Sequence, residues 1–318
     1  MKIVIVDRGN KIPASNYGGT ERVIWGLAYE LSRLGHQVIF MVPEGSTCSF
    51  AEIIFYNPEV DLIRLIPKDT DFIHFNFVPD FISDTPNLIT MHGNPGKGKN
   101  LPLNTVFVSE NHARRHGAEA FVHNGLLWEE YEKIDLNKNR TYFHFLGKAS
   151  WKVKNVAGAA EIAVKAKQKL KVLGGNRWKL SMLKRNPYYL LHTNLEFLGM
   201  VDDQTKMKVM QESKGLIFPI LWDEPFGLAI IESLYAGCPV FGTKRGSLPE
   251  LINEEVGFLS DSIDELSQAV IEKKFNSEIC HMYANENFNS RKMTEKYLYY
   301  YNEILNGRDI NSQVPKNI

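Results

Sequence analysis

The sequence predicts an α/β protein in which a doubly wound fold occurs twice. Short, nearly continuous apolar runs alternate with helical patterns along the chain, and such runs suit parallel strands covered on both faces. The 318 residues are too many for one ordinary domain and suit two domains of about 150 residues. A polar, charged stretch at 129–140 interrupts the alternation, which then begins again.

The first half is expected to contain several strands around one well-marked helix. In that helix, apolar residues from Val23 to Leu34 share one face. Thr20 is placed to cap its start and Gly35 to end it. The expected strands are Ile3–Val6, Val38–Val42, Leu62–Ile66, Phe72–Phe75, Leu88–Met91 and Val106–Val108.

The second half shows the same alternation without repeating the first half's sequence. A helix is expected at Val156–Lys167 and a last helix from about Asn289 to Leu305. The polar residues after that helix are expected to fray. The expected strands are Tyr142–Leu146, Lys171–Leu173, Leu195–Leu198, Gly215–Pro219 and Pro239–Phe241.

These patterns divide the chain into a first Rossmann-like domain at 1–128, a linker at 129–141 and a second Rossmann-like domain at 142–288. The last helix and its tail, 289–318, are expected to pack back toward the first domain. In doubly wound sheets, ligands bind at the carboxyl ends of the strands. We therefore expect the active site in a cleft between two domains whose strand ends face each other.

Composition excludes several classes of protein. The 37 basic and 37 acidic side chains balance, whereas a nucleic-acid-binding surface is strongly basic. Cys48, Cys238 and Cys280 have no metal-ligand spacing, which suits reduced thiols in a cytosolic protein. The first residues do not have the pattern of a signal peptide, and no apolar run approaches the roughly 20 residues of a membrane span. We expect a cytoplasmic protein whose contact with a membrane could only be peripheral.

The segment Phe218–Ile252 contains the most informative polar residues. A helix starting at Gly227 and Leu228 would present free N–H groups, which suit a diphosphate. Glu224, just before that start, can reach hydroxyls of a ligand. Glu232 can accept both hydrogens of a ribose diol. A first-turn acid that favours the helix dipole would explain Glu224 alone, but a carboxylate on the core side of the helix needs a partner.

This segment contains two glutamates separated by seven residues, with Pro225-Phe226-Gly227 after the first and Gly237-Cys238-Pro239-Val240 after the helix. It thereby resembles the donor-site signature of the retaining glycosyltransferases of family 4, and Lys244–Glu250 matches the continuation. A joint match of this kind is far more specific than a pair of glutamates. The resemblance implies the GT-B fold, with two Rossmann-like domains facing across a cleft. It implies that the first domain, 1–128, lies on the acceptor side and that the second, 142–288, binds the nucleotide sugar. Phe226, Gly227, Leu228 and Glu232 would bind the donor.

Two motifs of the first half extend the resemblance. Tyr17–Arg22 resembles the family's first glycine-rich loop. Gly18 and Gly19 would let the backbone approach a phosphate or an acceptor closely, and a plain strand–helix turn is the alternative. Thr90–Gly93 resembles the family's Thr-x-His-Gly, in which the histidine, here His92, contacts the donor sugar.

Phe145–Asn155 resembles the family's Gly-Arg-x-x-x-x-Lys-Gly, in which an arginine and a lysine neutralise the donor diphosphate. Lys148 stands where arginine is usual, so a bidentate clamp becomes a point charge. The spacing to the second cation is one residue longer. Lys154 is the expected second cation and Lys152 is its rival, with solvated surface lysines as the alternative reading.

The resemblance implies transfer of a hexosyl group, with retention, from a nucleoside-diphosphate sugar to a hydroxyl of a sugar, glycolipid or other acceptor. A UDP-sugar is favoured over a GDP- or ADP-sugar, and the pathway would make cell-surface polysaccharide or glycoconjugate. The catalytic residues would be Glu224, His92, Lys148 and Lys154. The donor-site segment Phe218–Ile252 contains no Asp-x-Asp motif, so no metal or other cofactor is expected. A sugar-nucleotide epimerase, a phosphorylase and a non-catalytic sugar-nucleotide-binding protein remain as alternatives.

Three further features have open interpretations. Val122–Gly125 resembles the family's His-Asn-Gly, although a turn role suits Asn124 equally well. His112 and His116 could bind a metal, but no third ligand is evident, so we expect an exposed helix. The basic stretch Trp178–Arg185 could touch a membrane or an acceptor, or form a solvated helix.

Overall fold

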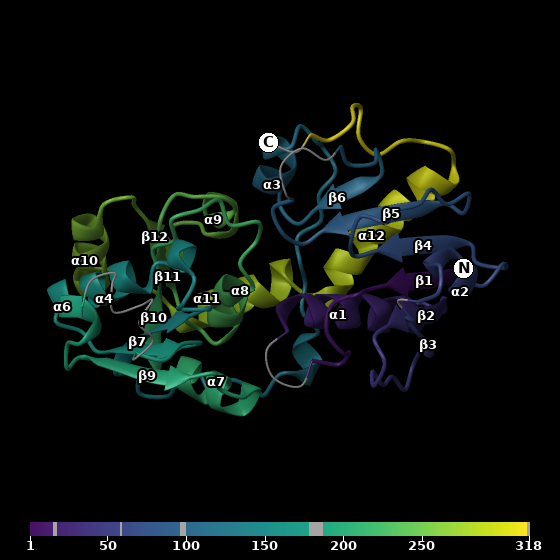
Figure 1. Ribbon diagram of the computed structural model, residues 1–318. Helices are drawn as coiled ribbons and strands as arrows, with labels where there is room; N and C mark the ends of the chain where they lie inside the picture. Colours follow the sequence, from purple (N-terminus) through teal and green to yellow (C-terminus); the bar gives the residue numbers. More distant parts are fainter. Residues whose placement is uncertain (15–17, 58, 96–99, 178–186, 317–318) are drawn as a thin grey trace. The chain divides into compact units, whose positions relative to one another are not determined.

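The computed structural model describes residues 1–14, 18–57, 59–95, 100–177 and 187–316. The chain forms two compact units. The first consists of Met1–Trp128 with Phe288–Ile318, and the second consists of Glu129–Asn287. Each unit contains a six-stranded sheet of parallel strands with helices between them (Figure 1). The predicted α/β architecture with two doubly wound sheets is confirmed.

The first sheet has the strand order β3-β2-β1-β4-β5-β6. Strands are added on one side of β1 up to β3 and on its other side from β4 onward, so the strand order reverses at β1. Ligands of doubly wound sheets bind beside this point, at the carboxyl ends of the strands. Those ends place Asp7, Asn76 and His92 on one edge. The strands are β1 (Lys2–Val6), β2 (Gln37–Val42), β3 (Glu52–Phe55), β4 (Phe72–Phe75), β5 (Asn87–Met91) and β6 (Thr105–Phe107).

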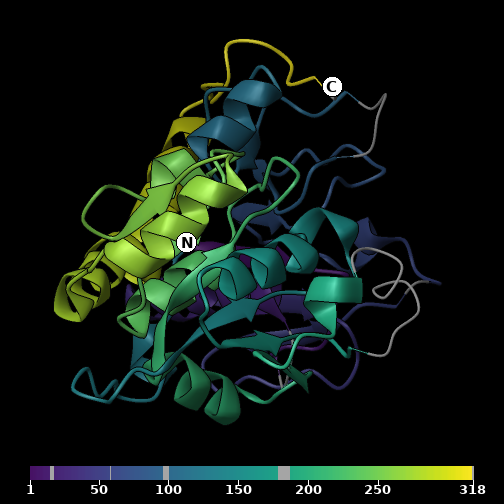
Figure 2. The same ribbon diagram turned by 90° about the vertical axis from the view of Figure 1, so that its left-hand side faces the viewer.

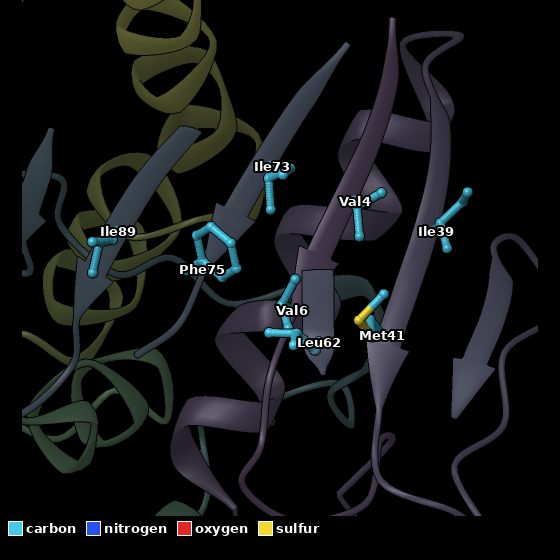
Figure 3. Close-up of a cluster of buried hydrophobic side chains, with 8 residues drawn as sticks. All are labelled: Val4, Val6, Ile39, Met41, Leu62, Ile73, Phe75 and Ile89. Atoms are coloured by element: carbon cyan, nitrogen blue, oxygen red, sulfur yellow. The ribbon is translucent and has the colours of Figure 1, made fainter. Parts of the chain in front are cut away.

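One face of this sheet is buried by a compact apolar cluster (Figure 3). The strands β1, β2, β4 and β5 contribute alternate residues, and Leu62 packs onto them from outside the sheet. Every member is at most 4% exposed, so burial of apolar area here stabilises the edge that carries the polar residues. The cluster consists of Val4, Val6, Ile39, Met41, Leu62, Ile73, Phe75 and Ile89.

The strand predicted at Leu62–Ile66 is wrong, because Leu62–Leu65 is a short helix, α2. The third strand is instead β3, which we did not predict. A short apolar run does not by itself distinguish a strand from a buried turn of helix. In α2, Leu62 is buried in the cluster while Ile63 is 46% exposed. β3 pairs only with β2 at the edge of the sheet, and its residues are only partly buried.

The first helix, α1 (Gly19–Arg33), begins two residues earlier than predicted. Gly18 occupies the N-cap position, so Thr20 lies inside the helix and does not cap it. Gly35 follows the C-cap with a φ of +84°, which confirms it as the residue that ends the helix. The last helix, α12 (Ser290–Leu305), packs against α1, and Ser290 Oγ donates a hydrogen bond to the buried Glu30 Oε1 at 3.0 Å.

The C-terminal segment after α12 packs on the first unit, so our expectation of a frayed tail is wrong (Figures 1 and 2). Asn311 is 3% exposed. Its side chain accepts from the N–H groups of Glu119 and Ala120 and donates to the carbonyls of Leu103 and Thr105. One amide side chain thereby satisfies four backbone groups, which a polar sequence alone does not reveal.

The helix α3 (Glu110–Arg115) contains His112, and His116 is its C-cap residue. The expectation that both are exposed is wrong, because both are buried. The ring of His116 stacks on Phe107 with a centroid distance of 5.2 Å, and His112 meets Phe107 edge to face. Both rings are therefore used for packing in the core. Among the described residues, no group of three or more potential ligands could hold a metal ion.

The second sheet has the order β12-β11-β10-β7-β8-β9. Its strands are β7 (Tyr142–Leu146), β8 (Leu170–Leu173), β9 (Leu195–Gly199), β10 (Ser213–Phe218), β11 (Val240–Gly242) and β12 (Gly257–Leu259). The helices are α4 (Val156–Lys165), α6 (Pro187–Leu190), α7 (Asp203–Gln211), α8 (Leu228–Tyr235), α9 (Leu248–Leu251), α10 (Ile263–Glu272) and α11 (Ser277–Asn287). Two short 3₁₀ helices occur at Trp128–Glu130 and Lys152–Lys154. None of the helices described is long and apolar enough to cross a membrane.

The polar stretch 129–140, expected as a linker, is part of the second unit and bonds to its strands and helices. Arg140 donates hydrogen bonds to the carbonyl oxygens of Ser213 at 2.7 Å and Ala236 at 2.9 Å. The backbone N–H of Asp135 donates to Gln211 Oε1 at 3.1 Å. Arg140, which in the sequence looks like part of a solvated linker, therefore forms hydrogen bonds to two backbone carbonyls of its own unit.

Buried histidines predict a loss of stability in acid. Burial lowers the pKa of His74, His112 and His144 to about 3 and that of His92 to about 4, against about 6.5 in an unfolded chain. The unfolded state therefore binds protons first as the pH falls below that value, and the free energy of unfolding decreases by about 1 kcal/mol per histidine at pH 5.5. Burial raises the pKa of Asp7 to about 6, which acts in the opposite direction but involves one group.

We expect a lower Tm at pH 5.5 than at pH 7.5, measured by circular dichroism. The His144→Asn variant removes one titrating group and should therefore show a smaller decrease. The asparagine amide keeps a polar atom near the position of Nδ1, which now bonds to Ser213. A Tm that is equal or higher at pH 5.5 would contradict this account.

Candidate functional site

Two loops meet at the carboxyl edge of the second sheet, where β7 and β10 are neighbours. The N–H of Leu221 donates to the carbonyl of Val153 at 2.8 Å, and Asn155 Nδ2 donates to the carbonyl of Pro219 at 2.8 Å. Asn155 has a φ of 53° and accepts from the N–H of Gly158, which caps α4. These bonds fix the loop after β7 against the loop after β10.

Lys154 and Glu224 form the centre of this site. Lys154 Nζ lies 2.6 Å from Glu224 Oε2, and Trp222 Nε1 donates to the same oxygen at 2.7 Å. The two charged side chains are 14% and 8% exposed. Charge-assisted hydrogen bonds of this length are among the stronger ones in proteins. The carboxylate is thereby held in one orientation by a cation and an indole.

The backbone around Glu224 is held by the loop that follows β11. The N–H of Ser247 donates to the carbonyl of Glu224 at 3.0 Å. Gly246 has a φ of +57°, and a Cβ there would lie 2.2 Å from the backbone nitrogen of Glu224. Only glycine fits both the backbone conformation and the contact.

The start of α8 lies beside Glu224. Its N-cap is Gly227, with a φ of +90°, and no side chain among the described residues caps this helix. A Cβ on Gly227 would lie 3.3 Å from Glu224 Cγ, so the carboxylate is adjacent to the helix start. The first N–H groups of a helix carry partial positive charge and lack partners within the helix. The N–H groups at the start of α8, which suit an anion, therefore lie beside Glu224 and its partner Lys154.

Glu232 has the partner that a buried carboxylate requires. Its Oε1 accepts from Lys206 Nζ at 2.6 Å and from the hydroxyl of Tyr131 at 3.1 Å. Lys206 also lies 3.1 Å from Asp203. The other carboxylate oxygen, Oε2, accepts no hydrogen bond from the part of the chain described. We did not identify Lys206 or Tyr131 from the sequence, although the requirement for a partner was the signal for them.

The other residues predicted for this unit lie in different environments. Lys148 is exposed, with Nζ 4.8 Å from the centroid of Trp151. Lys152 is exposed, whereas Lys154 is largely buried. Phe226 is 2% exposed, and its carbonyl accepts from Ser247 Oγ at 2.6 Å. The side chain of Phe226 therefore belongs to the core of this unit.

The first unit carries the remaining predicted residues. His92 follows β5, and its Nε2 lies 2.8 Å from Asn76 Oδ1. Gly18 and Gly19 open α1, and a Cβ on Gly18 would lie 2.9 Å from Glu21 Oε2. The glycine therefore leaves room for a buried carboxylate. Tyr17, the first residue of that motif, lies outside the described residues.

Two motifs had more than one interpretation in the sequence, Val122–Gly125 and Trp178–Arg185, and the structure describes the first of them. Asn124 is buried, and a Cβ on the following Gly125 would lie 2.1 Å from the carbonyl oxygen of Asn289. The backbone at Asn289 passes so close to position 125 that only glycine fits there. This steric reason for Gly125 favours a structural role for the motif, as a turn. The basic stretch Trp178–Arg185 lies outside the residues that the structure describes.

A model of the family described as Glycosyl transferases group 1 matches residues 128–290, just over half of the chain. Among characterised proteins, the chain is similar to N-acetyl-alpha-D-glucosaminyl L-malate synthase of Bacillus anthracis. The identity is 25% over 160 residues, which cover 47% of this chain and 41% of that protein. The chain spans 28% and 41% of the length of two curated relatives that it matches.

Two solved structures resemble the whole fold. AviGT4, a glycosyltransferase involved in avilamycin A biosynthesis, superposes with a TM-score of 0.78 at 20% identity, covering 96% of this chain and 98% of that one. HepE of Anabaena in complex with UDP-glucose superposes with a TM-score of 0.64 at 16% identity, covering 95% and 100%. At such identities the likeness shows the fold, which is GT-B. Because the family match covers the unit that holds Lys154, Glu224 and Glu232, the chain belongs to the group 1 glycosyltransferases and is a transferase.

Proposed function

We propose that this chain transfers a hexosyl group from a nucleoside-diphosphate sugar to an acceptor hydroxyl, with retention of the anomeric configuration. The observation that supports the proposal best is the meeting of Lys154 and Glu224 beside the uncapped start of α8. A cation and free N–H groups suit a diphosphate, and an adjacent carboxylate suits the hydroxyls of the attached sugar.

The diphosphate is the leaving group, and its growing negative charge is what the site stabilises. Lys154 and the N–H groups of Gly227 and Leu228 would act where that charge develops. The exposed Lys148 would swing from Trp151 to add a second cation. Lys154 suits this role better than Lys152 because it contacts the carboxylate that faces the sugar.

The donor would be held at two further points. Glu224 would orient the sugar hydroxyls, and His92 of the first unit would contact the same sugar. Glu232 Oε2 would accept a ribose hydroxyl, while Lys206 and Tyr131 hold Oε1. A UDP-sugar is favoured, and the UDP-glucose in the HepE complex supports this choice.

The displacement would take place on one face of the sugar. The bond between the acceptor oxygen and the anomeric carbon forms as the bond to the diphosphate breaks. The acceptor proton passes to the departing phosphate oxygen, so no protein nucleophile is assigned. The site as described offers no metal-ligand cluster, and the lysines and helix start supply the positive charge. We place the reaction in the cytoplasm, in synthesis of cell-surface polysaccharide or glycoconjugate on a sugar or glycolipid acceptor.

Binding of the donor can be tested before any acceptor is known. We expect one nucleotide among UDP, GDP, ADP and CMP, with its sugars, to raise the Tm, because a ligand that binds only the native state stabilises it. Glu232→Gln should weaken binding of that nucleotide about 10-fold, since a hydrogen bond to a charged group contributes roughly 1.5–3 kcal/mol. Titration calorimetry measures the affinity.

The exposed Glu254 in the same unit provides the matched control, and Glu254→Gln should bind like the wild type. If no nucleotide or nucleotide sugar raises the Tm of the wild type, the proposed donor is wrong. Equal affinity of Glu232→Gln and wild type would remove only the ribose role.

A further inference from the structure

Asn76 and His92 lie side by side because they follow neighbouring parallel strands. β4 ends at Phe75 and β5 at Met91, and the two strands pair in parallel with Phe75 opposite Ile89. Asn76 and His92 come directly after those ends, and His92 Nε2 lies 2.8 Å from Asn76 Oδ1. The asparagine is not part of any motif that we recognised in the sequence.

The amide of Asn76 can take only one orientation. Asn76 Nδ2 donates to the carbonyl oxygen of Val6, on the neighbouring strand β1, at 3.1 Å. The backbone N–H of Asn76 donates to the same oxygen at 3.0 Å. A carbonyl oxygen only accepts hydrogen bonds, so the amide nitrogen must face Val6. A flipped amide would place two oxygens 3.1 Å apart, and the hydrogen-bond network excludes it.

The orientation of the amide determines the tautomer of His92. Because Asn76 Oδ1 only accepts, His92 Nε2 must carry the hydrogen and donate it. A neutral imidazole has one ring hydrogen, so Nδ1 has a bare lone pair. Nδ1 makes no hydrogen bond with the residues that the structure describes.

The surroundings keep this ring neutral. Burial lowers the pKa of His92 to about 4. The nearest titratable groups that interact with it are His74, on β4, and His112, on α3, and burial lowers the pKa of both to about 3. Neither supplies a negative charge that would favour protonation. His92 is therefore an acceptor at neutral pH, with no cationic character.

We propose that Asn76 is a positioning residue that makes His92 a hydrogen-bond acceptor for a hydroxyl of the transferred sugar. The proposal rests on the proposed function. It assigns the direction of the hydrogen bond, from substrate hydroxyl to His92 Nδ1, and excludes the diphosphate as the partner of His92. A lone pair directed at a phosphate oxygen would repel it, because neither atom has a hydrogen to donate.

The tautomer can be measured without a substrate. In protein labelled with ¹⁵N in its histidine rings, we expect the His92 shifts at pH 7.5 to show a protonated Nε2 and an unprotonated Nδ1. In Asn76→Ala, the two shifts should move toward the average of exchanging tautomers. Asn87→Ala is the matched control, since Asn87 lies at the other end of β5 and its side chain donates to the carbonyl of Thr85. A wild-type His92 protonated at Nδ1 would overturn the proposal.

The direction of the hydrogen bond can be measured with donor analogues. Each hydroxyl of the transferred sugar is replaced in turn by hydrogen or by fluorine, which cannot donate. At one position we expect both replacements to lower kcat/KM about 2- to 10-fold in the wild type, the effect of one hydrogen bond. His92→Ala should lose a similar factor with the natural donor and show no further loss with those two analogues.

Asn76→Ala should show part of the His92→Ala loss, and Asn76→Asp should retain more activity because a carboxylate still accepts from Nε2. If the fluoro analogue keeps the activity that the deoxy analogue loses, His92 donates and the proposal is wrong. A chain that binds no nucleotide sugar would disprove the proposed function, while the ¹⁵N measurement would still decide the role of Asn76.

Discussion

Replacing Glu224 with glutamine is expected to lower kcat for sugar transfer by about 100-fold or more, since loss of one precisely oriented group in a reacting site has effects of this size. Glutamine has nearly the same shape and can still accept from Trp222 Nε1, which lies 2.7 Å from the carboxylate. The fold should therefore persist, with circular dichroism and Tm close to those of the wild type. Initial rates with saturating donor and acceptor measure the effect.

Glu255→Gln is the control for this experiment, because Glu255 is an exposed glutamate of the same unit. It should transfer at the wild-type rate. Glu224→Ala should be at least as inactive as Glu224→Gln, and its fold must be checked because it leaves Lys154 and Trp222 without their acceptor. Near-normal turnover of Glu224→Gln would show that this carboxylate does not orient the sugar.

The second large effect is expected for Lys154→Met. Removing one preorganised positive group from the leaving diphosphate should lower kcat by about 100- to 1,000-fold. Lys154→Arg should recover part of the rate, since the charge remains although its geometry differs. Lys152→Met should have little effect, because that side chain is exposed and lies outside the ion pair. This comparison decides between the two lysines that the sequence leaves as rivals.

Loss of stability could be mistaken for loss of catalysis in Lys154→Met, because Glu224 would lose its cation. Breaking a buried pair by removing one partner destabilises by roughly 3–5 kcal/mol, and partial exposure of this pair reduces that cost. The double variant with Glu224→Gln removes both charges. Its Tm should therefore lie above that of Lys154→Met, while its activity stays low. If Lys152→Met loses activity and Lys154→Met does not, the assignment of the cation is reversed.

The sequence by itself determined the fold class and most strands of both sheets. The apolar runs of β1, β2, β4 and β7 are buried on both faces, so their local pattern is unambiguous. The sequence did not predict the edge strands β3 and β12, and it predicted a strand where α2 lies, since short edge strands and single helical turns lack such a pattern. Glu224 and Glu232 were predicted as site residues because one contiguous and specific motif contains them, and Lys154 was predicted from a separate motif at Phe145–Asn155.

Only the tertiary structure decided what these residues contact. Glu232 takes Lys206 from α7 and Tyr131 from a segment 101 positions away. Asn311 binds backbone groups 191 or more positions away. Asn76 orients His92 only because β1, β4 and β5 are neighbours in the sheet. Local sequence sets backbone preference and burial, whereas a hydrogen bond between distant segments depends on the order and register of the strands that carry them.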